Sequence, residues 1–158
     1  MSDYYFKNIC LLEVFILKIQ VGDSACFSKT ISEYDVYQFA GLVGDFNSAH
    51  VNQVIAEKSI FKNRIAHGML VGSFISTVLG TKFPGDGTIY LEQNLKFLKP
   101  VYFGDTITAI VKVEEIINSE KGIIKLNTNV INQKDETVID GYAVVMYKEE
   151  FLDGEQNN

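Results

Sequence analysis

The pattern of apolar and polar positions divides the chain into a helical first half and a strand-rich second half. Residues 32–44 place apolar side chains at helical spacing, with Ser32 as the N-cap and acidic residues in the first turn. Asp, Asn and Ser then break the pattern at 45–49, and a second short helix is predicted over 51–61. Residues 65–79 are apolar on nearly every side, which is typical of a helix buried in a core.

Beyond residue 88 the apolar positions alternate with a period of two, in segments rich in Ile, Val, Thr and Tyr that turn residues separate. The predicted strands cover residues 88–98, 106–117, 122–130 and 137–147. A buried helix followed by such a meander predicts an α+β domain in which a curved antiparallel sheet wraps around one central helix. We expect this domain to span residues 17–148.

The two ends of the chain are expected to lie outside this domain. Residues 1–16 are an N-terminal extension, either an added element or the product of a misplaced start, and residues 149–158 are a loose acidic tail. The apolar stretch 9–19 is too short to cross a bilayer and is broken by Glu13 and Lys18, so no membrane partner is expected.

Composition narrows the class of protein further. The 158 residues are 47% apolar, enough to fill one core without disulfides or metal. A net charge of −6, with the basic residues dispersed, gives no electrostatic footprint for nucleic acid. Two cysteines and two histidines show neither a disulfide framework nor a metal-ligand spacing. The sequence therefore predicts a metal-free protein of a reducing compartment, by default the cytoplasm.

Asp45 and His50 are the first candidates for chemistry, because they stand five positions apart in the turn between two predicted helices. A carboxylate and an imidazole that converge from one loop can hold a water and move its protons. On spacing alone, however, the favoured alternative is structural: Asp45 caps the helix that begins near Val51, and His50 is an ordinary loop histidine.

The tripeptide His67-Gly68-Met69 is the second candidate. A glycine in the first turn of a helix lets a ligand approach N–H groups that have no intrahelical acceptor, which is one way to build an oxyanion hole. The alternative, again favoured on spacing alone, is that Gly68 only permits close packing. Ser73 and Ser76 have no neighbouring base in the sequence, and no glycine-rich phosphate or dinucleotide motif is present, so NAD, FAD and ATP are not indicated.

Four ordered motifs favour catalytic over structural roles for these residues. Together the motifs closely resemble the MaoC-like hydratase family, the (R)-specific enoyl-CoA hydratases with a hot dog fold. They are FAGLVGDFNSAH at 39–50, FKNRIAHGML at 61–70, PGDGTIY at 84–90 and FLKPVYFGD at 97–105. The resemblance extends from about residue 19 to residue 148. It implies a long helix wrapped by a curved sheet, a homodimer with each active site at the dimer interface, an acyl-CoA substrate and no cofactor.

The resemblance also implies roles for single residues. Asp45 and His50 would be the catalytic pair that holds the water, and the amide of Gly68 the oxyanion donor. The residues expected to bind or orient the substrate are Asn47, His67, Met69 and Ser76. Where the family's loop usually reads Asn-Pro-x-His, this chain has Asn47-Ser48-Ala49-His50. Loss of the proline frees φ at position 48 and is expected to loosen the turn that carries His50.

Three other functions remain open at this stage. A dehydratase acting on acyl carrier protein would perform the same chemistry on another carrier. A non-catalytic acyl-CoA-binding protein would keep the pocket and lose the geometry at Ser48-Ala49. A hot dog thioesterase is disfavoured, because the spacing Asp-x-Asn-x-x-His is the hydratase pattern.

Overall fold

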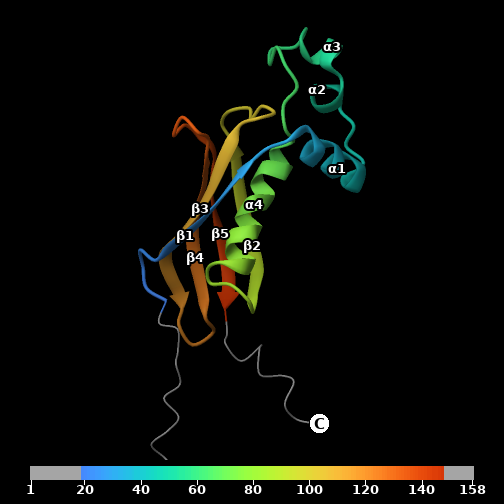
Figure 1. The fold of residues 1–158 in the computed structure, drawn as a ribbon. Helices are drawn as coiled ribbons and strands as arrows, with labels where there is room; N and C mark the ends of the chain where they lie inside the picture. Colours follow the sequence, from blue (N-terminus) through green and yellow to red (C-terminus); the bar gives the residue numbers. More distant parts are fainter. Residues whose placement is uncertain (1–18, 148–158) are drawn as a thin grey trace, which may run out of the picture.

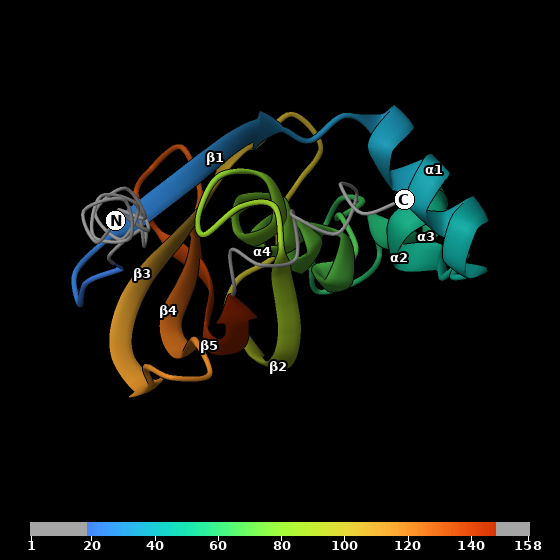
Figure 2. The same ribbon diagram turned by 90° about the horizontal axis from the view of Figure 1, so that it is seen from below.

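Residues 19–147 are described by a computed structural model of the protein, and they form a five-stranded antiparallel sheet that curves around one long helix (Figures 1 and 2). The strands are β1 (Ser24–Thr30), β2 (Thr88–Phe97), β3 (Thr106–Asn118), β4 (Ile123–Ile131) and β5 (Thr137–Tyr147). Their order in the sheet is β1-β3-β4-β5-β2, so β1 and β2 are the edges. This architecture confirms the predicted α+β hot dog fold.

The long helix α4 (Gly68–Thr81) lies in the concave side of the sheet and contacts β1, β2, β3 and β4. Its side chains Ile75, Val78 and Leu79 are fully buried. They pack with inward-facing strand residues such as Ile107 and Leu126 in one core. Burial of each such side chain contributes about 1.5–3 kcal/mol, so this helix holds the sheet in its curved form.

The period of two in the sequence corresponds to side chains that point alternately to the two faces of the sheet. Along β4, the inward residues Ile124, Leu126, Thr128 and Val130 are buried, and the residues between them are half-buried. Each strand from β3 to β5 pairs with two neighbours, whereas β2 pairs only with β5. The four strands predicted from the alternation are confirmed to within one residue at each end.

Three short elements stand beyond the N-terminal end of α4 (Figure 1): α1 (Glu33–Val43), α2 (Ser48–Val51) and α3 (Gln53–Ala56). The predicted helix over 32–44 is confirmed, because Ser32 caps α1 in a capping box and Gly44 ends it in the left-handed conformation. The prediction of one helix over 51–61 is wrong. Two single turns form instead, since Asn47 and Asn52 each cap a new helix with a side-chain oxygen.

Two further boundaries differ from the predictions. The strand β1 was not predicted, because its outer residues are Ser, Cys, Ser and Thr and its apolar positions are few. The central helix begins at Gly68 rather than at residue 65, since Ile65 forms a β-bridge with Tyr102 and the Ala66 N–H donates to the carbonyl of Val101. The segments 1–16 and 149–158 lie outside the described residues. Among residues 19–147 no helix is long and apolar enough to span a membrane.

Candidate active site

The loop between α1 and α2 fixes Asp45 by a short series of local hydrogen bonds. Gly44 (φ 79°) turns the chain out of α1. The Oδ1 atom of Asp45 then accepts from the Asn47 N–H at 3.1 Å, and the Oδ1 atom of Asn47 accepts from the Ala49 N–H at 2.9 Å. Asn47 is therefore the cap of α2. Asp45 keeps its second carboxylate oxygen free of these local bonds, and its side chain is half exposed.

His50 lies on α2, and its Nδ1 atom is 2.8 Å from the carbonyl oxygen of Ile65. A carbonyl can only accept, so Nδ1 carries the hydrogen and the Nε2 atom of the neutral ring keeps a lone pair. Burial lowers the pKa of His50, and the neighbouring ring of His67 acts in the same direction. The hydrogen bond to Ile65 and the charge of Asp45 oppose this without reversing it. His50 is thus a neutral base near pH 7.

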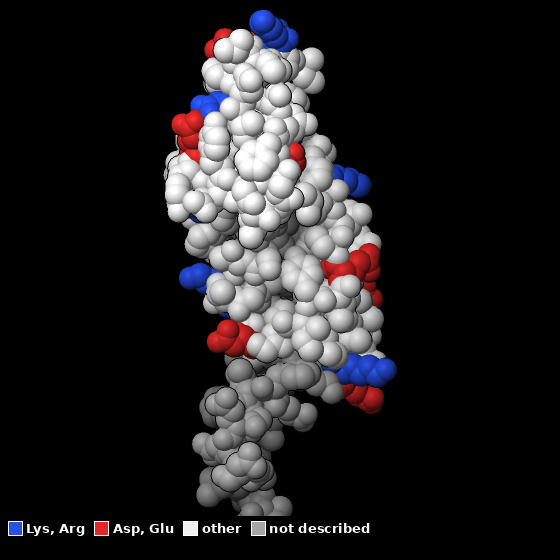
Figure 3. All heavy atoms as spheres, turned by 90° about the vertical axis from the view of Figure 1, so that its right-hand side faces the viewer, with Lys and Arg blue, Asp and Glu red and all other residues white. Residues whose placement is uncertain are grey.

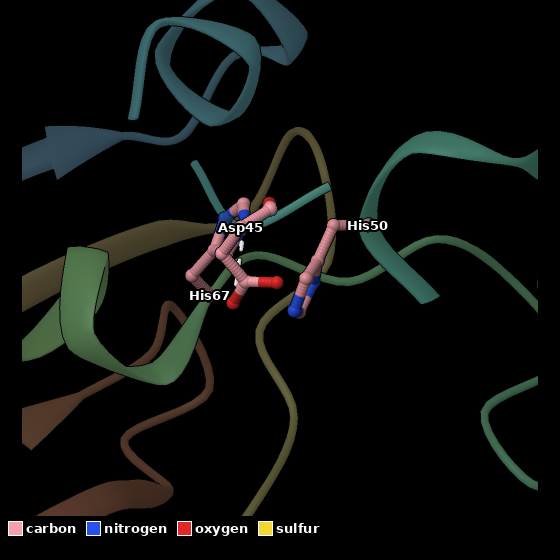
Figure 4. A group of neighbouring side chains, drawn as sticks. All are labelled: Asp45, His50 and His67. Carbon is pink, nitrogen blue, oxygen red and sulfur yellow. Dashed lines mark hydrogen bonds and ion pairs between the residues drawn. The ribbon is translucent and has the colours of Figure 1, made fainter. Parts of the chain in front are cut away.

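His67 lies next to both Asp45 and His50, as Figure 4 shows. Its side chain is only 2% exposed, and its Nε2 atom is 2.9 Å from the backbone oxygen of Asp45. The rings of His50 and His67 are in contact, with centroids 3.8 Å apart and planes tilted by 30°. One ligand atom from each of Asp45, His50 and His67 lies within 4.8 Å of the others. That spacing leaves room for a water held between the carboxylate and His50.

The same three side chains could be considered as ligands of a metal ion, but their arrangement does not fit one. A zinc ion needs lone pairs that converge on one point about 2.0–2.1 Å away. The rings of His50 and His67 pack against one another, and each has one nitrogen at a backbone carbonyl. The other nitrogen of His67, Nδ1, is closed off from solvent. An acid–base pair is the chemistry that this geometry supports.

A cavity of about 430 Å³ opens beside His50 and the first turn of α4. Its volume falls within the range of small-molecule sites. The residues that line it are mostly apolar: His50, Phe61, Ile65, Ala66, Gly68, Met69, Val71, Phe97, Leu98, Lys99, Pro100, Val101 and Ile139. Gly68 is the first residue of α4, so its N–H has no intrahelical acceptor and is available beside the cavity. Such a cavity suits a ligand with an apolar chain and a carbonyl group, because the walls are apolar and the Gly68 N–H can donate to the carbonyl.

The residues named from the sequence divide into two groups. His50, Gly68 and Met69 line this cavity, and Asp45 and His67 lie next to His50 without being part of the lining. Ser76 instead lies on the exposed face of α4, away from the cavity lining, and Asn47 holds the loop by capping α2.

Sequence reasoning missed two contributors to the site. One is the carbonyl of Ile65, which sets the tautomer of His50. The other is the ring of Phe97, which lies so close to Gly68 that a Cβ built there would come within 2.8 Å of it. A backbone carbonyl has no side-chain signature. Phe97 begins the motif at 97–105, but nothing in that motif indicates its contact with Gly68.

Comparison with known proteins agrees with the fold and the geometry. Residues 20–135 match the family described as "MaoC like domain". The chain belongs to the MaoC-like family. Among curated MaoC-like relatives, the (R)-specific enoyl-CoA hydratase of Rhodospirillum rubrum is 51% identical over 128 residues, covering 81% of this chain and 88% of the relative. The (R)-specific enoyl-CoA hydratase of Aeromonas caviae is 39% identical over 127 residues, covering 80% and 94%.

Solved structures extend the likeness from sequence to shape. The unliganded R-hydratase PhaJ1 from Pseudomonas aeruginosa superposes with a TM-score of 0.79 at 40% identity, covering 84% of each chain. The MaoC-like resemblance inferred from four motifs is therefore confirmed, together with the hot dog architecture.

Proposed function

We propose that the protein is an (R)-specific enoyl-CoA hydratase, a hydro-lyase that reversibly adds water to a trans-2-enoyl-CoA and gives an (R)-3-hydroxyacyl-CoA. The observation that carries the proposal is that His50, which lies beside Asp45, lines one apolar cavity together with Gly68, whose N–H has no intrahelical acceptor. The relatives with this activity in their names cover most of the chain.

The tautomer of His50 supports separate roles for His50 and Asp45 in activating the water. With Nδ1–H donated to Ile65, the Nε2 lone pair is the proton acceptor, and the Asp45 carboxylate orients the water by accepting its other hydrogen. The hydroxide bonds to C3 of the enoyl group as its proton passes to Nε2. His50 then returns a proton to C2, so that the elements of one water are added and the enzyme is unchanged.

Charge develops on the thioester oxygen while C3 is attacked, because the electrons of the C2–C3 double bond move toward the carbonyl. The Gly68 N–H, at the positive end of a 14-residue helix, is in a position to stabilise that charge. The apolar walls would take the acyl chain, with Met69 at the entrance. No redox step occurs, so the reaction calls for no redox cofactor.

The active form is proposed to be a homodimer in the cytoplasm. The edge strand β2 and the residue after it expose large apolar side chains, namely Tyr90, Leu91, Phe97 and Leu98. The other edge, β1, exposes Ser24, Cys26, Ser28 and Thr30 instead. Charged residues lie mostly at the margins of the face that carries α1, α4 and β2, and most of its middle is uncharged (Figure 3). An exposed apolar edge strand favours association, and pairing with a second copy of the chain would bury these side chains of β2.

The decisive experiment follows crotonyl-CoA spectrophotometrically and determines the configuration of the 3-hydroxybutyryl-CoA formed. We expect loss of the enoyl absorbance and formation of the (R) product. Crotonyl-acyl carrier protein, tested at the same concentration, separates the hydratase from the acyl-carrier dehydratase. Saturable binding of crotonyl-CoA without turnover would contradict the proposal and leave a binding protein.

A further inference from the structure

His67 is the residue at the site to which the proposed reaction gives no part. Its side chain is 2% exposed and is absent from the cavity lining, whereas its neighbours Ala66 and Gly68 are part of it. The Nδ1 atom of His67 is buried without a hydrogen-bond partner. The side chain therefore acts on the protein around it rather than on a substrate.

The contacts of the ring assign its tautomer. The backbone oxygen of Asp45, 2.9 Å from Nε2, can only accept, so Nε2 carries the hydrogen. The Asp45 carboxylate is 3.9 Å from the same atom, beyond hydrogen-bond distance. The ring of His67 packs against the rings of His50 and Phe39, with centroids 3.8 Å and 5.1 Å away. No acceptor faces Nδ1, so a second proton there would have no partner.

This hydrogen bond joins two parts of the site that are 22 residues apart in sequence. One is the loop that carries the Asp45 carboxylate. The other is the first turn of α4, because the peptide bond after His67 supplies the Gly68 N–H. We propose that His67 is a positioning residue: its Nε2–H holds the Asp45 carbonyl and its ring supports His50, so that the acid–base pair and the oxyanion donor keep one geometry. This role rests on the proposed hydratase activity.

The unpartnered Nδ1 atom argues against packing as the only role. Burial of an acceptor without a hydrogen bond costs free energy that a phenylalanine of similar shape would not. The α4 helix also gains no side-chain cap from His67. What the imidazole offers here and an apolar ring lacks is a donor at the Nε2 position, and the only bond it makes within the described residues is to Asp45.

Three variants distinguish the donor from the ring. The amide nitrogen of glutamine in His67→Gln reaches about as far as Nε2, whereas that of asparagine in His67→Asn reaches only about as far as Nδ1. His67→Phe keeps a ring without a donor. We expect His67→Asn and His67→Phe to lower kcat by about 10²-fold, the effect of a displacement of about 1 Å, with KM within a few-fold of the wild type. His67→Gln should recover at least tenfold of that loss.

The measurements are kcat and KM for crotonyl-CoA hydration, with thermal melting to show that each variant is folded. Wild-type kcat in His67→Phe would overturn the proposal in favour of packing, and a raised KM with unchanged kcat would mean direct substrate binding. Equal losses in all three variants would overturn the role proposed for the Nε2–H donor.

A second readout needs no turnover, and because the chain has two histidines, the signals of His67 are identified by comparison with His50→Gln. In protein with ¹⁵N-labelled histidine, long-range ¹⁵N–¹H correlations separate the Nε2–H tautomer, which we expect for His67, from the Nδ1–H tautomer, which would contradict the proposal. A wild-type protein that shows the expected tautomer and hydrates no enoyl-CoA would refute the hydratase assignment instead, and with it the catalytic part of this role.

Discussion

Asp45 and His50 face one another across the space proposed for a single water, so each should depend on the other. We expect Asp45→Asn and His50→Gln each to lower hydration by about 10²–10⁴, the usual contribution of a placed acid or base. The double variant should be little slower than either single one, because groups that act as a unit lose most of their effect when the first is removed. Steady-state kinetics on crotonyl-CoA provides the test.

The matched control for this pair is Asp86→Asn, which removes an exposed carboxylate beyond the far end of α4 and should leave the rate unchanged. Multiplicative losses in the double variant would mean that Asp45 and His50 work in separate steps. Near-normal turnover in the single variants would make the pair structural.

At Gly68 the structure changes the reason for an expected loss. A Cβ at this position would lie 2.8 Å from Cδ1 of Phe97, so Gly68→Ala must displace a ring that forms part of the cavity wall. We expect kcat to fall by about 10²-fold, since a displacement of about 1 Å is enough for that. Gly80→Ala, on the same helix with open space around it, should keep the wild-type rate.

The combination Gly68→Ala/Phe97→Leu separates the two causes. If the new methyl group acts by displacing the ring, Gly68→Ala should lower kcat less in the Phe97→Leu background than it does in the wild type. No recovery would locate the effect at the oxyanion donor itself, where the methyl group holds the thioester away from the Gly68 N–H.

The lowered pKa of His50 also predicts how stability changes with pH. A free histidine has a pKa of about 6.5. The folded state resists protonation of His50, so the unfolded chain binds the proton more readily. Stability from this residue is complete above about pH 6.5 and is lost as the pH falls below it toward the folded-state pKa. Urea unfolding at pH 7.5 and 5.5 should show a larger loss in the wild type than in His50→Gln. Equal losses would contradict the assigned shift.

At the scale of elements, Arg64 connects the segment before α4 to the short helices. Its guanidinium donates to the carboxylate of Glu33 and to the Tyr37 hydroxyl on α1, and through Nε to Gln53 on α3 at 3.0 Å. It also lies 4.8 Å above the ring of Phe103. Lysine cannot make these contacts together, because it lacks the planar fork of donors.

Hydrogen bonds to charged groups contribute about 1.5–3 kcal/mol, and exposure of Glu33 weakens its ion pair with Arg64. We therefore expect Arg64→Lys to lower the free energy of unfolding by about 1–2 kcal/mol. Because Arg64 precedes Ile65, whose carbonyl holds His50, kcat should fall as well. The control is Lys58→Arg, an exchange between the same two residue types at an exposed position after α3. Unchanged urea midpoints in both variants would show that the network adds no stability.

The elements that could be predicted from the sequence are those whose burial has a clear period. The alternation in residues 88–147 gave β2 to β5 because one face of each strand packs on α4. At β1 the outer residues are small and polar, so its pairing with β3 is a tertiary effect. Ile65 and Ala66 are apolar like the helix that follows, yet they pair with the segment at 101–102. Periodicity cannot separate a buried strand-like segment from a buried helix.

The candidate site was predictable to a similar extent. Asp45, His50 and Gly68 could be named because their motifs resemble a known family, and spacing alone favoured structural roles for them. The backbone carbonyls of Ile65 and Asp45, which hold the two histidines, are contacts over 15 and 22 residues that no local pattern encodes.

At the scale of the whole molecule, the exposed apolar edge of β2 predicts association of two chains. Leu91 is half exposed at a bulge of this strand, where the register with β5 shifts between Tyr90 and Glu92. Sedimentation velocity at micromolar concentration should show a dimer for the wild type. Leu91→Lys should shift the protein toward monomer, because a charged side chain on an edge strand opposes pairing with another edge.

The control is Ile117→Lys, which adds the same charge at a similarly exposed apolar position near the end of β3, an inner strand of the sheet. It should leave the dimer intact. A monomeric wild type would contradict the homodimer, and an unaffected dimer in Leu91→Lys would show that the chains associate through another face. If each site needs the second chain, hydratase activity should fall in Leu91→Lys in proportion to the monomer that sedimentation detects, and recover as protein concentration rises.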